Sequence, residues 1–178
     1  MAIKAEELQL RKLINVIYTL GYQALAPARV REIVLALDAV LLDCRFNAIS
    51  RMPGFGARQL EALMTPAPAD LDPDQPRYVR KGNLLGGRGH TTRAGITALQ
   101  PYAEDEAHCV LLCNEEHPVD CHRHSAITGP HPPQALHIYR TRLFYSSELE
   151  RVQEGEIGFD ELLSGSWEEW LNVLRNNP

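Results

Sequence analysis

The stretch Leu13-Ile-Asn-Val-Ile-Tyr-Thr19 opens the part of the sequence that decides the fold. It is rich in β-branched residues and is followed by Gly21, which indicates a buried strand. Pro27 suits the first turn of a helix, in which apolar residues recur at three- and four-residue spacing up to Leu37. A second apolar run, Val40-Leu-Leu-Asp-Cys44, indicates another buried strand. Strand, helix and strand within about thirty residues predict a βαβ unit, with parallel strands and a right-handed crossover.

Shorter patterns continue this alternation along the chain. They predict helices at 5–12, 56–64 and 93–104, strands at 77–81 and 108–113, a short helix from Cys121, and a last strand at 135–139. Residues 65–76 hold four prolines and three aspartates, which predicts a surface loop. We therefore expect one α/β domain over residues 1–178, a three-layer, Rossmann-like sandwich with a mostly parallel sheet.

The C-terminal region, residues 141–178, is predicted to be a helical extension of this domain. Its main pattern is a helix from Ser166 to Arg175 with Trp167, Trp170, Leu171 and Leu174 on one face. Such a face is expected to pack onto the sheet, or alternatively onto a second copy of the chain.

Composition places the chain among globular proteins. Hydrophobic residues make up 44% and charged residues 23% of the sequence. The longest apolar runs are far shorter than the ~18 residues of a membrane span, and residues 1–12 lack the apolar stretch of an export signal. We therefore expect a cytoplasmic protein without membrane contact, in which the four cysteines are reduced.

Charge is unevenly distributed on a chain of net charge −5. Residues 77–93 contain five basic residues and no acid, whereas residues 148–169 contain eight acids and one base. The basic segment is either a solvated surface or a positive mouth for an anionic ligand. Because the sequence pI is about 5.8, a small anionic ligand is favoured over long nucleic acid, which remains the second option.

Polar residues follow three of the predicted strands. Tyr18 to Tyr22 follow the first strand, Asp43, Arg45, Ser50 and Arg51 the second, and Cys113 and Glu115 the strand at 108–112. In open parallel sheets, ligands bind beyond the carboxyl ends of the strands. These groups are therefore expected at one edge of the sheet.

The segment from Cys113 to Arg123 is the densest cluster of reactive residues. Asp120 is predicted to cap a helix whose first turn holds Cys121, His122 and Arg123, which would favour a Cys121 thiolate and also hold a phosphate. Three interpretations remain: structural cysteines, a metal site of Cys113, Cys121 and His122, or nucleophilic and acid–base chemistry. The spacing matches no standard zinc pattern, and adjacent Cys and His ligands are awkward at one tetrahedral centre.

Several motifs occur in a characteristic order. They are Ile17-Tyr-Thr-Leu-Gly21, Leu42-Asp-Cys-Arg45 with Ser50-Arg51, Leu84-Leu-Gly-Gly87, and Cys113-Asn-Glu115 with Pro118 and Cys121-His-Arg123. Over roughly residues 14–138, this resembles the bacterial and archaeal family called "domain of unknown function 488", whose last motif reads Cys-Ala-Glu-x-x-Pro-x-x-Cys-His-Arg. The resemblance implies an α/β fold and a common site, but no reaction. The residues it assigns to that site are Asp43, Arg45, Ser50, Arg51, Cys113, Glu115, Cys121, His122 and Arg123.

The chain departs from the family pattern in three places. Tyr22 stands where the family has His, and Ala48 replaces a Pro. Residues 128–133 are rich in proline where the family continues a helix.

Two functional hypotheses follow. The first is an enzyme acting on a phosphate-bearing small molecule, nucleotide or nucleic-acid component. In it, Arg45, Arg51 and Arg123 clamp the anion, Glu115 or His122 acts as acid or base, and Cys121 or Cys113 as nucleophile. Tyr18, Ser50, Gly86 and Gly87 complete its binding site, and Asp43 is expected to be buried against Arg51 or Arg123. The second is a non-catalytic module of the same fold that binds a nucleotide, nucleic acid or partner protein. Neither hypothesis specifies a cofactor.

Overall fold

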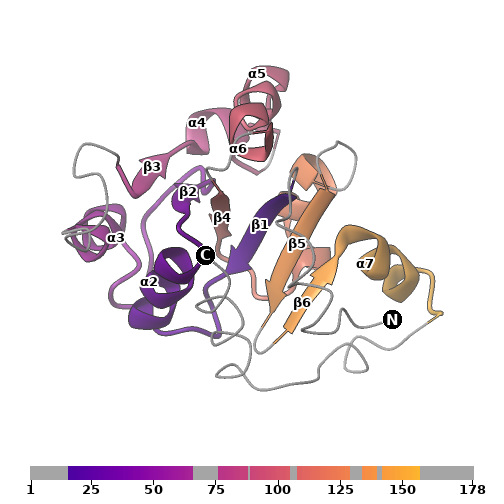
Figure 1. Ribbon diagram of the computed structural model, residues 1–178, viewed down its shortest axis with the longest axis horizontal. Coiled ribbons are helices and arrows are strands. Elements are labelled where there is room, and N and C mark those ends of the chain that lie inside the picture. The colour runs from indigo at the N-terminus through magenta and orange to yellow at the C-terminus, as the bar shows by residue number, and fades with distance from the viewer. Residues whose placement is uncertain are drawn as a thin grey trace.

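A mostly parallel sheet forms the centre of the molecule. The computed structural model describes residues 16–65, 76–87, 89–104, 108–128, 134–139 and 142–156. In these residues a six-stranded sheet has the order β3-β2-β4-β1-β5-β6, and every pairing is parallel except that of β5 with β6 (Figure 1). The strands are β1 (Val16–Gly21), β2 (Val40–Asp43), β3 (Tyr78–Arg80), β4 (Cys109–Cys113), β5 (Gln134–Tyr139) and β6 (Arg142–Tyr145).

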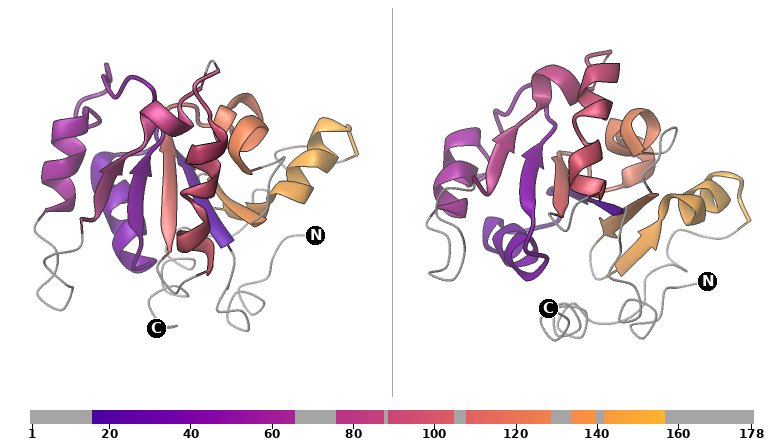
Figure 2. Two further views of the ribbon diagram at one scale, coloured as in Figure 1. Left: turned by 90° about the horizontal axis from the view of Figure 1, so that it is seen from above. Right: turned by 45° about the horizontal axis from the view of Figure 1, so that its top comes forward.

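Helices cover both faces of the sheet, as predicted for three layers. α2 (Pro27–Ala36) and α3 (Ala57–Met64) lie on one face. The other face carries α4 (Gly82–Leu85), α5 (Arg93–Thr97), α6 (Gln100–Glu104), the 3₁₀ turn η1 (Pro118–Asp120) and the π-helical η2 (Arg123–Thr128). Figure 2, left, shows α2 behind the strands and the α4–α6 segment in front of them. α7 (Ser146–Gln153) packs beside β5 and β6.

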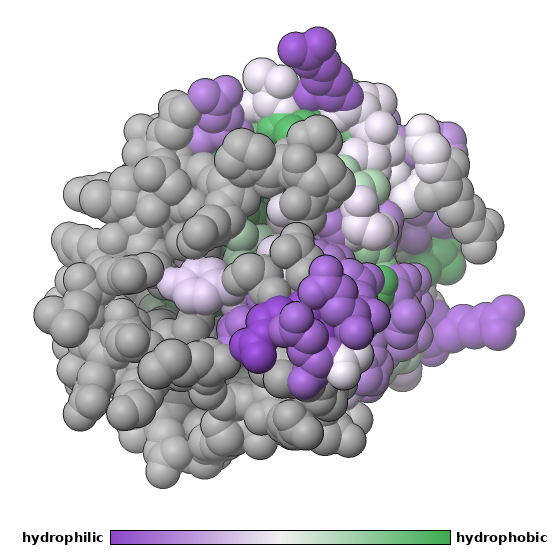
Figure 3. All heavy atoms as spheres, turned by 90° about the vertical axis from the view of Figure 1, so that its right-hand side faces the viewer, coloured by the Kyte–Doolittle hydropathy of each residue, from purple (hydrophilic) through white to green (hydrophobic). Residues whose placement is uncertain are grey.

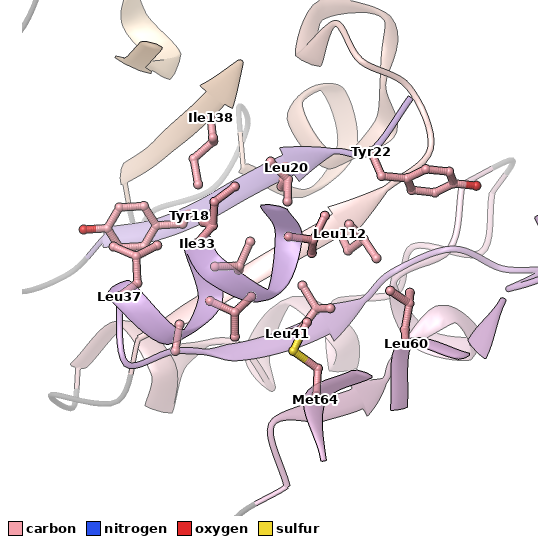
Figure 4. Close-up of a cluster of buried hydrophobic side chains, with 14 of the residues drawn as sticks. Tyr18, Leu20, Tyr22, Ile33, Leu37, Leu41, Leu60, Met64, Leu112 and Ile138 are labelled. Atoms are coloured by element: carbon pink, nitrogen blue, oxygen red, sulfur yellow. The ribbon is translucent and has the colours of Figure 1, made fainter. Parts of the chain in front are cut away.

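The α2 face holds the larger core. Pro27 begins α2, and Val30, Ile33 and Val34 of that helix are fully buried against the sheet. Alternate residues of the strands, such as Leu20 and Leu41, meet them (Figure 4). Fully burying a side chain of this size contributes about 1.5–3 kcal/mol, so packing rather than helix propensity holds α2 in place.

The second core lies under the short helices. Every residue of β4 is buried, as expected for a central parallel strand covered on both faces. Cys109 and Leu111 point to this side together with Leu42, and they meet Leu85 of α4 and Leu99.

Strand order is where the sheet differs most from expectation. β1 and β2 are parallel, as the βαβ pattern predicts, but β4 lies between them. In the dinucleotide-binding order 3-2-1-4-5-6, the first two strands are neighbours. The structure therefore shows one α/β domain with a different strand order.

The end of the described chain also corrects the sequence prediction. β5 is not the last strand, because β6 comes after it in the sequence and pairs with it antiparallel. The region from residue 141 therefore begins as part of the sheet and becomes helical only at α7. Coloured residues on the α7 side are mainly hydrophilic (Figure 3).

Three predicted elements lie outside the described residues: the helix at 5–12, most of the loop at 65–76, and the tryptophan-bearing helix at 166–175. The helix predicted at 93–104 is split into α5 and α6, with Thr92 Oγ1 capping α5 by accepting the Gly95 N–H at 3.0 Å. None of the described helices is both long and apolar enough to span a bilayer.

Candidate metal centre

Four donor side chains converge beyond the carboxyl end of β4. The Sγ atoms of Cys113 and Cys121, a carboxylate oxygen of Glu115 and a ring nitrogen of His122 all lie within 4.8 Å of one another. We refer to these four residues as the donor cluster. Both thiols donate to Glu115 Oε2, Cys113 at 3.1 Å and Cys121 at 3.2 Å. His122 Nδ1 lies 3.6 Å from Cys113 Sγ and 3.9 Å from Cys121 Sγ.

The loop that carries Glu115 is held by its backbone. A Cβ atom at Gly21 would come 1.8 Å from the Glu115 carbonyl oxygen, so only glycine fits at the end of β1. The fully buried Arg123 donates to the carbonyls of Glu115 at 2.5 Å and Glu116 at 2.9 Å. Arg123 therefore positions the Glu115 loop, and its guanidinium is not free to clamp an anion.

The helix after this loop begins one residue later than predicted. Cys121, not Asp120, has the extended backbone of a residue that precedes a helix, with φ −118° and ψ 138°. Its carbonyl accepts the N–H groups of His124 at 3.0 Å and Ser125 at 3.1 Å. Asp120 is exposed and belongs to η1. The predicted cap is wrong because the 3₁₀ turn started by Pro118 uses Asp120 as its last residue.

Electrostatics in the cluster oppose the predicted thiolate. The hydrogen-bonded Cys113 sulfur and burial raise the pKa of the Cys121 thiol above its usual value. The pKa of Cys113 is also raised: although Cys121 opposes the shift, Cys44, burial and Glu115 outweigh it. Two buried thiols beside a carboxylate retain their protons unless a cation replaces them. These shifts oppose a preformed thiolate at Cys121.

The pKa values of Glu115 and His122 shift in opposite directions. Burial alone would raise the pKa of Glu115, but hydrogen bonds from the two thiols and its own backbone, together with the Arg123 charge, lower it. Burial alone would lower the pKa of His122, yet Cys121, the Cys44 carbonyl and Glu115 raise it. A carboxylate and a histidine thus face the two thiols.

A second polar cluster lies at the same edge but on the opposite face of the sheet. Asp43 is fully buried and accepts from Arg45 Nε at 2.8 Å, from Arg45 Nη2 at 2.5 Å and from the Tyr78 hydroxyl at 2.6 Å. Arg45 also donates to the Phe55 carbonyl at 2.7 Å. Asp43 is buried against an arginine as predicted, but its partner is Arg45 rather than Arg51 or Arg123.

Tyr22 and Ser50 extend this second cluster. The Tyr22 ring stacks on Phe55 with centroids 4.3 Å apart, and Arg45 Cζ lies 5.0 Å from the Tyr22 ring centroid. The Tyr22 hydroxyl donates to Ser50 Oγ at 3.1 Å. Burial alone would lower the pKa of Arg45, but Asp43 and Tyr22 raise it, so the guanidinium remains charged.

The predicted single pocket is therefore divided in two by the sheet. Side chains alternate along a strand, so Asp43 and Arg45 face the α2 side, whereas Leu42 and Cys44 face the donor cluster. Arg51 is exposed, and no described contact joins it to either cluster. The proposed three-arginine clamp is not formed.

Tyr18 lies away from this edge. Its ring packs edge-on against His108, which precedes β4, at 5.9 Å between centroids. Figure 4 shows Tyr18 and Tyr22 at opposite ends of β1. Burial, followed by the Tyr145 charge, raises the pKa of Tyr18 to about 12. Tyr18 was predicted to follow the first strand, but β1 continues to Gly21, three residues beyond it. Tyr18 therefore lies within the strand and in the core.

The glycine loop, predicted to bind substrate, reaches the donor cluster at Gly87. A Cβ atom there would lie 3.0 Å from His122 Nδ1 and 3.2 Å from its Cγ, so Gly87 packs against the imidazole ring. Gly86 instead lies against Phe46, with 2.8 Å between its virtual Cβ and that of the phenylalanine. Sequence reasoning missed Phe46, which follows the predicted site residue Arg45, and Tyr78, which lies within the strand predicted at 77–81.

Comparisons with protein-family models, with curated proteins and with solved structures give no match to this chain.

Proposed function

We propose that the protein is a metal-dependent enzyme whose metal, best matched by Zn²⁺, is held by Cys113, Cys121 and His122, with Glu115 beside the fourth, open position. The observation that carries this proposal is the convergence of the four donor atoms within 4.8 Å. Thiolate, imidazole and carboxylate are the ligands that zinc takes in proteins.

The spacing of the donors supports a tetrahedral ion. Zinc–sulfur and zinc–nitrogen bonds of about 2.3 and 2.0–2.1 Å place a sulfur and a nitrogen ligand about 3.5 Å apart. The two sulfur–nitrogen distances here are 3.6 and 3.9 Å. Adjacent Cys121 and His122 meet this spacing because Cys121 is extended rather than helical, which removes the objection that their adjacency raises.

The donor set also supports catalysis. Three protein ligands with a fourth position open to water are typical of catalytic zinc, which lowers the pKa of bound water to about 7. Glu115 is half-buried and lies in contact with both thiols, so its carboxylate would be in position to take the proton of that water.

The substrate class remains the one proposed from the sequence: a phosphate-bearing small molecule, nucleotide or nucleic-acid component. The position beyond the parallel strands and the acid-free basic segment support it. Resemblance of the Cys113–Arg123 motif to the family named above supports membership of that family. The second candidate is a non-catalytic module that binds the same ligands.

The metal is tested by elemental analysis of the purified full chain. We expect stoichiometric zinc in the wild type, and loss of it in Cys113→Ser, Cys121→Ser and His122→Ala. Cys109→Ser is the matched control, because Cys109 is buried on the same strand outside the cluster. Wild-type protein that binds no more zinc than Cys113→Ser would contradict the metal centre.

Glu115→Gln separates the enzyme from the binding module. The variant is isosteric, so it should still bind zinc and ligand but lose turnover of phosphorylated substrates. Equal activity of zinc-loaded wild type and Glu115→Gln would exclude Glu115 as the base. Ligand binding without turnover in the wild type would favour the module.

A further inference from the structure

A shallow cavity lies at the carboxyl ends of β2 and β3, outside the donor cluster. It has a volume of about 250 Å³ and is lined by Phe46, Arg80, Gly82 and Asn83. We propose that this cavity binds a nucleotide, with the base on the Phe46 ring and the phosphate at Arg80. The inference names a substrate class for the metal centre and rests on the proposed function for turnover, whereas binding itself is independent of the metal.

An exposed aromatic platform supports the base. Phe46 and Ile49 are the large hydrophobic side chains left exposed in the described part of the chain, and Phe46 is 54% exposed. The Phe46 ring is held flat on His90, with centroids 3.7 Å apart and an interplanar angle of 9°. A fixed aromatic ring that lines a cavity is a stacking surface for a planar base, worth about 1–3 kcal/mol per base.

Positive charge supports the phosphate. The segments 44–58 and 76–93, which border the cavity, contain no acidic residue. Arg45 and Arg77 are paired with Asp43 and Asp38, but Arg80 is exposed and no described carboxylate pairs with it.

The rest of the molecule has the opposite sign. The acids of residues 148–156 lie on and after α7, at the far end of the sheet from β3 (Figure 1). On a chain of net charge −5, an anion is therefore drawn to the β2–β3 end.

The backbone segments beside the cavity are closely packed. A Cβ atom at Gly82 would come 2.0 Å from the Arg45 carbonyl oxygen, so the backbone of Gly82 packs directly against that of Arg45. The side chain of Arg45 is itself fixed by Asp43. Phe46 follows Arg45 directly in the chain. The buried ion pair therefore helps to fix the backbone that carries Phe46.

Two consecutive glycines join the cavity to the donor cluster. Gly86 packs against Phe46 and Gly87 against the ring of His122. Adjacent residues of one loop therefore contact the proposed base-stacking residue and a member of the donor cluster. This proximity supports a nucleotide as the substrate of the same protein rather than as a remote effector.

The test is calorimetric titration of the zinc-loaded full chain with adenosine monophosphate, adenosine, inorganic phosphate and a single-stranded oligonucleotide. Phe46→Ala should weaken binding of adenosine monophosphate by about 5- to 150-fold, the loss of one stacked base. Arg80→Gln should weaken binding of adenosine monophosphate but leave binding of adenosine unchanged. Ile49→Ala and Arg58→Gln are the controls, since they remove an exposed apolar side chain and an exposed arginine that do not line the cavity; both should bind as the wild type does.

Zinc content measured on each variant keeps the two proposals apart. Zinc-loaded wild type that binds no adenosine monophosphate overturns the nucleotide site and leaves the metal centre standing. Controls that weaken binding as much as Phe46→Ala overturn it too, as does binding of the oligonucleotide alone. Conversely, binding that depends on Phe46 and Arg80 in wild-type protein that takes up no zinc supports the nucleotide site and contradicts the metal centre.

Discussion

Removal of the Asp43 carboxylate should destabilise the whole domain. In Asp43→Ala, the Arg45 guanidinium, whose side chain is 4% exposed, loses its ion partner while remaining buried. The Tyr78 hydroxyl loses its acceptor at the same time. Burial, followed by the hydrogen bond to Asp43, raises the pKa of Tyr78, so its hydroxyl is a donor throughout the physiological range. The variant therefore leaves an uncompensated charge and an unpaired donor inside the protein.

The magnitude follows from this burial. Removing one partner of a buried ion pair costs about 3–5 kcal/mol. For a domain of this size, each kcal/mol lowers Tm by about 2–4 °C, so Asp43→Ala should melt about 6–20 °C below the wild type. Thermal unfolding followed by circular dichroism measures this, and urea unfolding should show a lower midpoint with an unchanged slope.

A matched surface pair provides the control. Glu32 lies 2.6 Å from Arg29, but both side chains are partly exposed, at 29% and 40%. Glu32→Gln should therefore cost less than about 1 kcal/mol. The double variant Asp43→Leu with Arg45→Met, which removes both charges, should recover much of the lost stability. A Tm of Asp43→Ala within the range of Glu32→Gln would refute the reasoning.

Three further predictions concern other parts of the structure. Alkylation of the zinc-loaded protein at pH 7 should spare all four cysteines; after chelation Cys113 and Cys121 should label, and the other two only on unfolding, as peptide mapping will show. Early labelling of Cys121 with zinc bound would instead restore it as a nucleophile. Burial lowers the pKa of His137 well below 6.5, so this residue is neutral in the folded state and takes up a proton only on unfolding. Its contribution to stability is therefore complete above pH 6.5 and falls by about 1.4 kcal/mol per pH unit below it; His137→Gln should lack this slope in urea titrations from pH 7 to 5. Gly21→Ala should displace the Glu115 loop, so it should lower zinc affinity as well as Tm; unchanged zinc affinity would show that the loop tolerates the methyl group.

Local patterns were sufficient for the elements and for part of the site. Continuous apolar runs and a proline-started helix with apolar residues at three- and four-residue spacing predicted β1, α2 and β2, because burial imposes such patterns on the sequence. The donor cluster was also within reach of sequence analysis. Its four members span only residues 113–122, so a single loop brings them together whichever strands lie beside β4.

Only the tertiary structure determined which side chains lie next to one another. Nothing in the sequence separates the role of Arg123 from that of Arg45. In the structure, Arg123 supports the Glu115 loop by donating to backbone carbonyls, whereas Arg45 neutralises Asp43. The sequence does not reveal that the sheet separates Asp43 from Cys113, because the face on which a strand end presents its side chain depends on register with its neighbours. The insertion of β4 between β1 and β2, and the contact of Gly87 with His122, are likewise pairings between distant segments. Such contacts are selected by the free energy of the whole packed core, which no local pattern encodes.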